Sequence, residues 1–446
     1  DVAANPQTQA NLYLNSLAKK MSGKSICCDM FVMSEKYSDI VTIGEISRYT
    51  GGELYYYPKF QGMESLKLQK DMMNCFDSDC GFDVEVRLRT STGVFIEEYL
   101  GNLLPSTEMV DTVRIGYMKS DQSVIGIMDY DEEINKFVGF FLQAVVLYTD
   151  IMGKKRMKIF NGFYSTVSEA NDIFKKADLD VIFTTILRQT IKGGNFRNNE
   201  SLNLEVLEKV TNILAAYRKY CSVHAKSSIL LLPEALKLLP IFVLGAMKTP
   251  AFMAFGQMNS IARDFAFDGA ASDLKFASIY QASGKNTKTL LKEYYPTCYN
   301  VTGHLNGNVS EDAFSDDSHK VRLAINNFKE DEVYLFESNG VFKLFVGYSV
   351  SEEIKAKLFG EGVKMEQNTQ LTTMLYSNAL ADNNNLMTKL IYWISGMSFV
   401  PMVLVDVVPF RLIDLPKYMV EDKTFMGVSY FDLLVYCHKK IQQKLN

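Results

Sequence analysis

The stretch Ile46-Ser-Arg-Tyr-Thr-Gly-Gly-Glu-Leu-Tyr-Tyr-Tyr-Pro-Lys-Phe60 decides how the rest of the chain is interpreted. A helical pattern runs into Gly51-Gly52, and glycine tolerates the turn that leaves a helix. A short aromatic strand follows from Leu54 to Tyr57 and ends at Pro58. The sequence alternates helix and strand before this stretch, and it has an all-β pattern for about a hundred residues after it. We therefore expect a junction between two domains here.

The residues before the junction predict the end of an α/β domain. Helical patterns cover 7–22 and roughly 37–49, and residues 25–33 are typical of a buried strand in a parallel sheet. This strand and Leu54–Tyr57 are too few for a stable doubly wound sheet. We therefore expect residues 1–58 to be the C-terminal part of an α/β domain whose first part is missing from the chain.

The next part of the chain is typical of a β domain. Asp83-Val-Glu-Val-Arg-Leu-Arg89 alternates charged and apolar residues, as a strand with one buried face does. Further strands are predicted at Val124–Met128 and Phe137–Tyr148, and Met152-Gly-Lys-Lys155 is typical of a hairpin turn. Together these patterns predict a β-sandwich over residues 59–162.

The pattern then becomes helical over residues 163–285. One predicted helix keeps an apolar face over three turns, at Val206, Leu207, Val210, Ile213, Leu214 and Tyr217. Residues 286–412 return to a mixed α/β pattern, with a hairpin whose turn is Asn339-Gly340. A helix near 350–358 and a strand near 402–408 complete this predicted small domain.

Residues 413–446 end in a predicted helix. Ser429 and Asp432 form a capping box, and an apolar stripe follows at Tyr430, Leu433, Leu434, Cys437 and Ile441. Such a stripe must be buried, so we expect this helix to dock on the helical domain. The whole chain is therefore predicted to be a multidomain α+β protein.

Composition and motifs exclude several classes of function. The formal net charge of −5 over 446 residues gives no overall attraction to nucleic acid. Seven cysteines without a disulfide spacing indicate a reducing setting, and four histidines without ligand spacing predict no metal site. No hydrolase, phosphate-binding or dinucleotide-binding motif is present, so we expect no enzyme activity. No apolar segment reaches the length of about 18 residues that a membrane span needs.

The sharpest polar feature is the pair Arg87 and Arg89. Two residues apart on a strand, their side chains share one face of the sheet. Two neighbouring guanidinium groups can hold a carboxylate-bearing peptide through paired hydrogen bonds. The alternative is a solvated face on which Asp83 and Glu85 neutralise the two arginines.

Two further groups of residues are candidates for binding. Lys154, Lys155 and Arg156, with Lys158, form a basic hairpin tip that could face an anionic membrane, although charged turns are also ordinary. Tyr55, Tyr56 and Tyr57 could line a peptide groove, or their rings could simply be buried in the core.

Four segments in order resemble one known family. They are Ser47-Arg-Tyr-Thr-Gly-Gly-Glu-Leu-Tyr-Tyr-Tyr-Pro58, Arg87-Leu-Arg-Thr-Ser-Thr-Gly93, Leu232-Pro-Glu-Ala-Leu-Lys-Leu-Leu-Pro240 and Ser429-Tyr-Phe-Asp-Leu-Leu-Val-Tyr-Cys-His-Lys-Lys-Ile-Gln442. They are similar to the cargo-adaptor subunit of the inner COPII vesicle coat, and the tyrosine run and the Cys-His-Lys-Lys ending favour this subunit over its GTPase-activating paralogue. Residues 270–289 match the family pattern poorly.

The resemblance implies a fold and a function. The family order is an α/β (vWA-like) trunk, a β-sandwich, an all-α helical domain and a gelsolin-like domain, which agrees with the order predicted above. The family's adaptor is peripheral on the endoplasmic reticulum membrane, pairs with the GTPase-activating subunit, meets the small GTPase of the coat indirectly, and binds short sorting-signal peptides of cargo. Arg87 and Arg89 match its Arg-x-Arg strand that holds acidic signals. Its zinc finger is absent from this chain, so no cofactor is expected.

A second class of function remains open. The domain at 286–412 also resembles the repeated unit of gelsolin-like actin or calcium regulators. Such regulators usually carry several copies, and this sequence shows no internal repeat. The carboxylates Asp331, Glu332 and Glu337 do not form a recognisable calcium loop. The adaptor interpretation is therefore favoured over the regulator.

Overall fold

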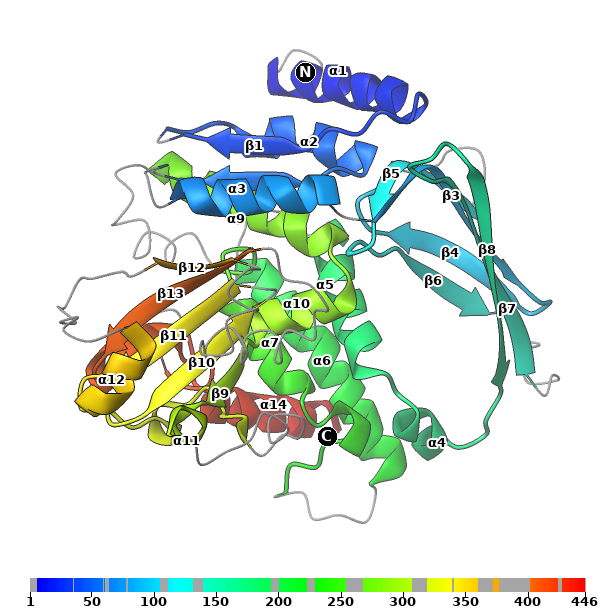
Figure 1. Cartoon of the computed structure of the whole chain (residues 1–446). Helices are drawn as coiled ribbons and strands as arrows, with labels where there is room; N and C mark the ends of the chain where they lie inside the picture. Colours follow the sequence, from blue (N-terminus) through cyan, green and yellow to red (C-terminus); the bar gives the residue numbers. More distant parts are fainter. Residues whose placement is uncertain are drawn as a thin grey trace. The chain divides into compact units, whose positions relative to one another are not determined.

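The computed structural model describes most of the chain. The described residues are 6–34, 36–58, 60, 64–77, 79–104, 111–130, 139–193, 200–222, 229–253, 268–306, 319–338, 341–359, 372–376, 402–423 and 427–445. They form two compact units, one of Asp1–Leu290 with Tyr436–Asn446 and one of Leu291–Val435. Figure 1 gives the order of the elements along the chain, and each unit is described by itself.

The predicted junction at Gly51-Gly52 is confirmed, and packing adds a second reason for the two glycines. Helix α2 (Ile40–Thr50) ends at Gly51, whose φ of 80° is in the left-handed region that glycine favours. A Cβ atom on Gly51 would lie 2.0 Å from the backbone oxygen of Tyr117, and one on Gly52 would lie 2.2 Å from that of Cys28. Strand β2 (Leu54–Tyr57) follows as predicted. A side chain at either glycine would therefore push neighbouring backbone away.

The N-terminal α/β part of the first compact unit, called the first α/β unit below, is smaller and more exposed than the sequence predicts. After helix α1 (Pro6–Ser22), strand β1 covers only Met30–Met33 and pairs in parallel with β2. The parallel pairing is as predicted, but the prediction of a buried strand over 25–33 is wrong, because β1 is half-buried and Met33 is exposed. Within the described residues β1 pairs with β2 alone, so its other edge is not covered by a strand.

A helix from far along the chain completes this unit. In α9 (Asp268–Gly284), the buried Asp273 carboxylate accepts hydrogen bonds from the backbone N–H groups of Ser38 and Ile40, at 2.6 and 3.0 Å. Tyr280 of α9 donates its hydroxyl hydrogen to the carbonyl of Val41 at 2.8 Å. Asp273 therefore serves as the N-terminal cap of α2, a role that a local side chain usually plays.

Residues 64–77 correct the expectation of an uninterrupted β pattern after the junction. They form helix α3 (Glu64–Asp77), because the segment is rich in Leu, Lys, Gln and Met and has no β-branched residue. The helix packs beside β2, since Asp71 accepts a hydrogen bond from the Tyr57 hydroxyl at 2.7 Å.

In the predicted β-sandwich region, the described residues form six strands in two sheets. The strands are β3 (Cys80–Thr90), β4 (Val94–Leu100), β5 (Thr112–Lys119), β6 (Ile125–Tyr130), β7 (Gly139–Thr149) and β8 (Lys155–Ser165). One sheet has the order β5-β3-β7-β8, and β4 pairs with β6 in the other. Val84 and Val86 of β3 are buried against Val113 and Ile115 of β5, so the predicted alternation of apolar and charged residues is confirmed.

Helices make up most of the next region, as predicted. They are α4 (Ala170–Lys175), α5 (Leu179–Gly193), α6 (Glu200–Cys221), the 3₁₀ helix η3 (Glu234–Leu236), α7 (Leu239–Met247) and α9. The apolar stripe of α6 is confirmed, because Val206, Val210 and Leu214 are fully buried. Pro240 lies in the first turn of α7, where its missing N–H is not needed.

A buried lysine in α9 makes stability depend on pH. Lys275 donates a hydrogen bond to the carbonyl of Met253 at 2.7 Å, and burial lowers its pKa from 10.5 to about 8. Between these two pH values the unfolded chain holds a proton that the folded chain has released, so the free energy of unfolding rises with pH. We expect Lys275→Met to remove this rise, because no group then titrates at this position. Urea unfolding of both proteins from pH 7 to 10 checks this, and parallel pH profiles would contradict it.

The second unit is built on a five-stranded sheet. Its strands are β9 (Thr297–Asn300), β10 (Val333–Ser338), β11 (Val341–Gly347), β12 (Thr372–Tyr376) and β13 (Met402–Phe410), in the order β12-β13-β11-β10-β9. Only β11 and β13 run parallel. The short elements around it are α10 (Thr287–Tyr294), which begins in the first unit, α11 (Thr302–Leu305), η7 (Ile325–Asn327), α12 (Glu352–Phe359) and η9 (Leu412–Tyr418). The predicted hairpin pairing is confirmed, and its turn at Asn339-Gly340 lies outside the described residues.

The C-terminal helix α14 (Tyr430–Leu445) has the predicted capping box. The backbone N–H of Asp432 donates to the Ser429 hydroxyl at 3.1 Å, and the Ser429 N–H donates to the Asp432 carboxylate at 3.2 Å. Cys437 and Ile441 are buried, and Lys444 is hydrogen bonded to Asn212 of α6. Among the described residues, the helices are too short or too polar to cross a membrane.

Candidate functional site

Arg87 and Arg89 lie on the same face of β3, as the sequence predicts. Arg87 is opposite Val145 of β7, and Arg89 is opposite Gln143. Arg89 is exposed, and within the described part of the chain it has no ion-pair partner. The open face of this sheet therefore carries two guanidinium groups, and Arg89 is available to a ligand.

The partner of Arg87 differs from the one expected. Its Nε and Nη2 atoms both lie 2.7 Å from Oδ2 of Asp111, and both side chains are about one-third exposed. Although desolvation opposes the shift, hydrogen bonds from Arg87 hold the pKa of Asp111 below its ordinary value. Asp111 can therefore be displaced from Arg87 only by another anionic group of similar geometry.

The structure does not support the alternative interpretation, in which Asp83 and Glu85 neutralise the two arginines. Asp83 has a φ of 49° and lies at a bulge, where the register between β3 and β7 shifts. Glu85 pairs instead with Arg114 of β5, at 3.4 Å. The bulge and the neighbouring strand thus draw both carboxylates away from the arginine pair.

Apolar side chains continue this face beyond the arginines. Residues directly opposite one another in antiparallel strands share a face, so Arg87, Val145 and Ile159 lie in one row across β3, β7 and β8. Glu85, which pairs with Arg114, begins the next row, and Leu147 and Met157 continue it. Ile159 and Met157 are exposed. A ligand held by the arginines would therefore meet an apolar surface on one side.

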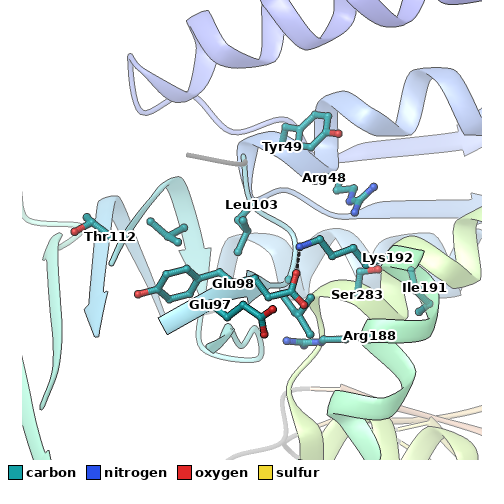
Figure 2. A pocket seen from close by; sticks show the side chains of 14 residues that line it. Arg48, Tyr49, Glu97, Glu98, Leu103, Thr112, Arg188, Ile191, Lys192 and Ser283 are labelled. Atoms are coloured by element: carbon teal, nitrogen blue, oxygen red, sulfur yellow. Dashed lines mark hydrogen bonds and ion pairs between the residues drawn. The ribbon is translucent and has the colours of Figure 1, made fainter. Parts of the chain in front are cut away.

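A cavity of about 300 Å³ lies between α2, β4, β5 and α5. Figure 2 shows that charged side chains surround it and that Lys192 of α5 is bonded to Glu98 of β4. The buried Arg188 of α5 donates hydrogen bonds to the carbonyls of Ser123 and Lys285, at 2.9 and 2.6 Å. The cavity is lined by Arg48, Tyr49, Glu97, Glu98, Tyr99, Leu100, Gly101, Leu103, Thr112, Val113, Arg188, Ile191, Lys192 and Ser283.

Tyr99 connects the cavity to the arginine pair. Its ring lines the cavity, while its hydroxyl donates to the backbone carbonyl of Asp111 at 2.7 Å and accepts from the N–H of Leu88 at 3.3 Å. These bonds hold Asp111 next to Leu88 of β3, which lies between Arg87 and Arg89 in the sequence. None of the site residues predicted from sequence lines the cavity.

Of the two interpretations of Tyr55, Tyr56 and Tyr57, the structure supports burial of the rings in the core and not a peptide groove. Tyr56 and Tyr57 are only 7% and 2% exposed. The Tyr55 ring stacks on Phe31 of β1 at 4.8 Å, and its hydroxyl is hydrogen bonded to Glu53. Helices α3 and α9 contact β2, so the rings form the core of the first α/β unit.

A buried charged cluster was missed by sequence reasoning. Lys119 of β5 is 2% exposed in its side chain, and its Nζ lies 3.0 Å from Glu53, 3.4 Å from Asp29 and 3.3 Å from the sulfur of Cys75. Burial alone would lower the pKa of Lys119, but Glu53 and Asp29 raise it above its ordinary value. These residues lie far apart in the sequence, so no local pattern could predict the cluster. Its lysine joins the first α/β unit to the β-sandwich.

The described residues contain no group of three His, Cys, Asp or Glu side chains placed to hold a metal ion. The carboxylates considered for a calcium site have other partners. Glu332 is bonded to Asn300, Tyr334 and Lys329, and Glu337 pairs with Lys292 at 3.1 Å. These contacts favour a structural role for both carboxylates, which weakens the calcium-regulator alternative.

Comparison with known proteins agrees with this architecture. Three family models match the chain in order: the Sec23/Sec24 trunk domain at residues 2–76, the beta-sandwich domain at 81–167 and the helical domain at 178–267. The chain belongs to the Sec23/Sec24 family. Within this family, it is 28% identical to protein transport protein SEC24 B of Arabidopsis thaliana and 24% identical to human Sec24C, over 98% and 99% of this chain.

A solved structure has the same fold as this Sec23/Sec24-family chain. The human COPII-coat protein Sec24c matches 97% of the chain with a TM-score of 0.79 and 23% identity, and the match covers 54% of that protein's chain. The chain spans 38% of the length of the Arabidopsis and human relatives. The trunk model ends at residue 76 and so includes α3. The predicted domain limits, and the gelsolin-like assignment of 286–412, stay predictions.

Proposed function

We propose that this chain is part of a COPII-coat cargo adaptor, without catalytic activity, that binds acidic export signals of membrane cargo for transport from endoplasmic reticulum to Golgi. The family membership and the names of the relatives support the coat assignment. The observation that carries the binding role is the open face of β3, where Arg87 and Arg89 lie side by side and Arg89 is exposed.

The geometry suits a short peptide with two neighbouring carboxylates. One carboxylate would accept two parallel hydrogen bonds from Arg89, as guanidinium and carboxylate geometry favours. The second would compete with Asp111 for Arg87, which is held through its Nε and Nη2 atoms. Apolar residues of the peptide would contact Ile159 and Met157, which lie exposed on the same face.

We expect affinity for a single signal to be weak. The contact area of a short peptide is small, and Asp111 must give up its bond to Arg87 before the second carboxylate can bind. Several weak contacts on one membrane would add up to selective capture of cargo. The proposed setting is peripheral on the endoplasmic reticulum membrane, next to the GTPase-activating subunit and, indirectly, the small GTPase of the coat.

The test is the affinity of a di-acidic peptide for wild type and for Arg87→Ala/Arg89→Ala. Charge-assisted hydrogen bonds contribute about 1.5–3 kcal/mol each, so we expect the double variant to bind at least about tenfold more weakly. Isothermal titration or fluorescence anisotropy measures the change.

Arg156→Ala is the matched control for this test. Arg156 is exposed and lies on the opposite face of the same sheet, in register with Tyr148. The control variant should keep wild-type affinity, and the amide form of the peptide should not bind. Equal affinity of the wild type and the Arg87/Arg89 variant would sink the proposal.

A further inference from the structure

The turn between β7 and β8 exposes two large apolar side chains at its tip. The two strands form a long antiparallel hairpin, as Figure 1 shows, with Thr149 paired to Lys155 at its end. Ile151 and Met152 are 73% and 77% exposed. Small and polar residues usually occupy such turns, because their side chains remain in water. An adjacent Ile-Met pair at this place therefore requires an explanation.

Most backbone N–H groups of this turn are hydrogen bonded within the turn. The Asp150 carboxylate accepts hydrogen bonds from the N–H groups of Met152 and Lys154, at 3.0 and 2.9 Å. The N–H of Gly153 donates to the Asp150 carbonyl, and the N–H of Asp150 donates to the carbonyl of Lys154, both at 2.9 Å. The N–H groups of Asp150, Met152, Gly153 and Lys154 therefore keep their hydrogen bonds when the tip leaves water, which lowers the cost of that transfer.

Basic side chains surround the apolar tip. Lys154, Lys155, Arg156 and Lys158 lie within a few residues of it, against the single carboxylate of Asp150. Asp150 is held by Arg156 at 2.9 Å, and hydrogen bonds from Lys154 and Arg156 keep its pKa below the ordinary value. Lys155 and Arg156 point to opposite faces of the hairpin, because successive residues of a strand alternate. The positive charge therefore surrounds the tip on both faces.

We propose that this hairpin inserts Ile151 and Met152 into the interfacial layer of an anionic lipid membrane. The apolar pair would be buried at the boundary of headgroups and acyl chains, while the lysines bind lipid phosphates. Charge complementarity identifies the partner, because excess positive charge next to exposed apolar side chains fits an anionic lipid surface. The proposal does not rest on signal binding at Arg87 and Arg89, whose side chains point from a different strand.

Vesicle flotation tests the two parts of the proposal separately. The vesicles are phosphatidylcholine, alone or with about 30% phosphatidylserine. We expect the wild type to bind the anionic vesicles preferentially. Ile151→Ser/Met152→Ser should lower the partition coefficient about tenfold or more, since two buried apolar side chains are lost. Lys154→Ala/Lys155→Ala should lower it by about fivefold for each charge removed.

Matched variants control for surface charge and apolar exposure in general. Lys175→Ala/Lys176→Ala removes two exposed lysines at the C-terminal end of α4, the second being its C-cap residue, and Ile413→Ser removes an exposed isoleucine of η9. Both should bind vesicles like the wild type. Arg87→Ala/Arg89→Ala should also keep vesicle binding, so that failure of signal recognition is distinguished from failure of membrane contact.

Depth of insertion is read from a tryptophan at the tip. The chain has a single tryptophan, so Met152→Trp is made together with Trp393→Phe. On anionic vesicles its emission should shift to shorter wavelength and be quenched by brominated lipid. Unchanged emission, or equal binding of the wild type and the double serine variant, would overturn the proposal in favour of adsorption by charge alone or of a protein partner at the tip.

Discussion

Replacing Lys119 with methionine is expected to destabilise the contact between the first α/β unit and the β-sandwich by about 3–5 kcal/mol. The ammonium group is buried and lies within ion-pair distance of Glu53 and Asp29. Without it, two carboxylates remain close together with no cation between them, and each must be protonated or solvated. Hydrogen–deuterium exchange of peptides from β1, β2 and β5 measures the loss, because these strands carry the cluster.

A second substitution distinguishes a charge effect from a packing effect. Glu53→Gln in the Lys119→Met background removes one of the two carboxylates that would repel each other. It should therefore recover part of the lost protection against hydrogen–deuterium exchange. Lys175→Met, at an exposed lysine of α4, is the control and should change nothing. A loss below about 1 kcal/mol for Lys119→Met would mean that the cluster behaves as a solvated surface pair.

Replacing Arg188 with methionine should cost about 3–5 kcal/mol as well, for a different reason. Arg188 is 2% exposed, and its guanidinium group donates to the carbonyl and hydroxyl of Ser123 and to the carbonyl of Lys285. Methionine fills similar space but leaves these acceptors buried without the donor. The arginine thus fastens α5 to the segments around Ser123 and Lys285.

The measurement is exchange protection of the segments around Ser123 and Lys285, together with urea unfolding. Arg188→Lys retains the charge but not the forked geometry, so it should fall between wild type and methionine. Lys192→Met is the matched control on the same helix, because Lys192 is half exposed and its pair with Glu98 should matter little. Wild-type protection in Arg188→Met would show that the three hydrogen bonds are dispensable.

Local patterns in the sequence predicted the parts of the fold that depend on neighbouring residues. The junction at Gly51-Gly52, the stripe of α6 and the capping box at Ser429 all rest on short spacings, and the structure confirms them. Helix α3 was missed, although its composition favours a helix, because the β pattern after residue 83 was extended backwards over it. The exposure of β1 could not be predicted, because it depends on which strands surround it.

In the candidate site, too, local patterns predicted some features, and others depend on the assembled fold. Alternation along β3 places Arg87 and Arg89 on one face, and this could be predicted from sequence alone. The pairing of Arg87 with Asp111 could not, because it depends on the register between β3 and β5. The cavity combines α2, β4 and α5, which are separate in the sequence, so only the assembled fold reveals it.

The capping of α2 by Asp273 has a consequence for the order of folding during synthesis. The N–H of Ile40 and the carboxylate that receives it are 233 residues apart. At about 5–20 residues per second, a ribosome needs roughly 10–50 s to make the intervening chain. Through that interval the start of α2 has no Asp273 to bind, while the β-sandwich strands emerge next to it. The α/β unit at the N-terminal end is therefore completed late, when α9 leaves the ribosome.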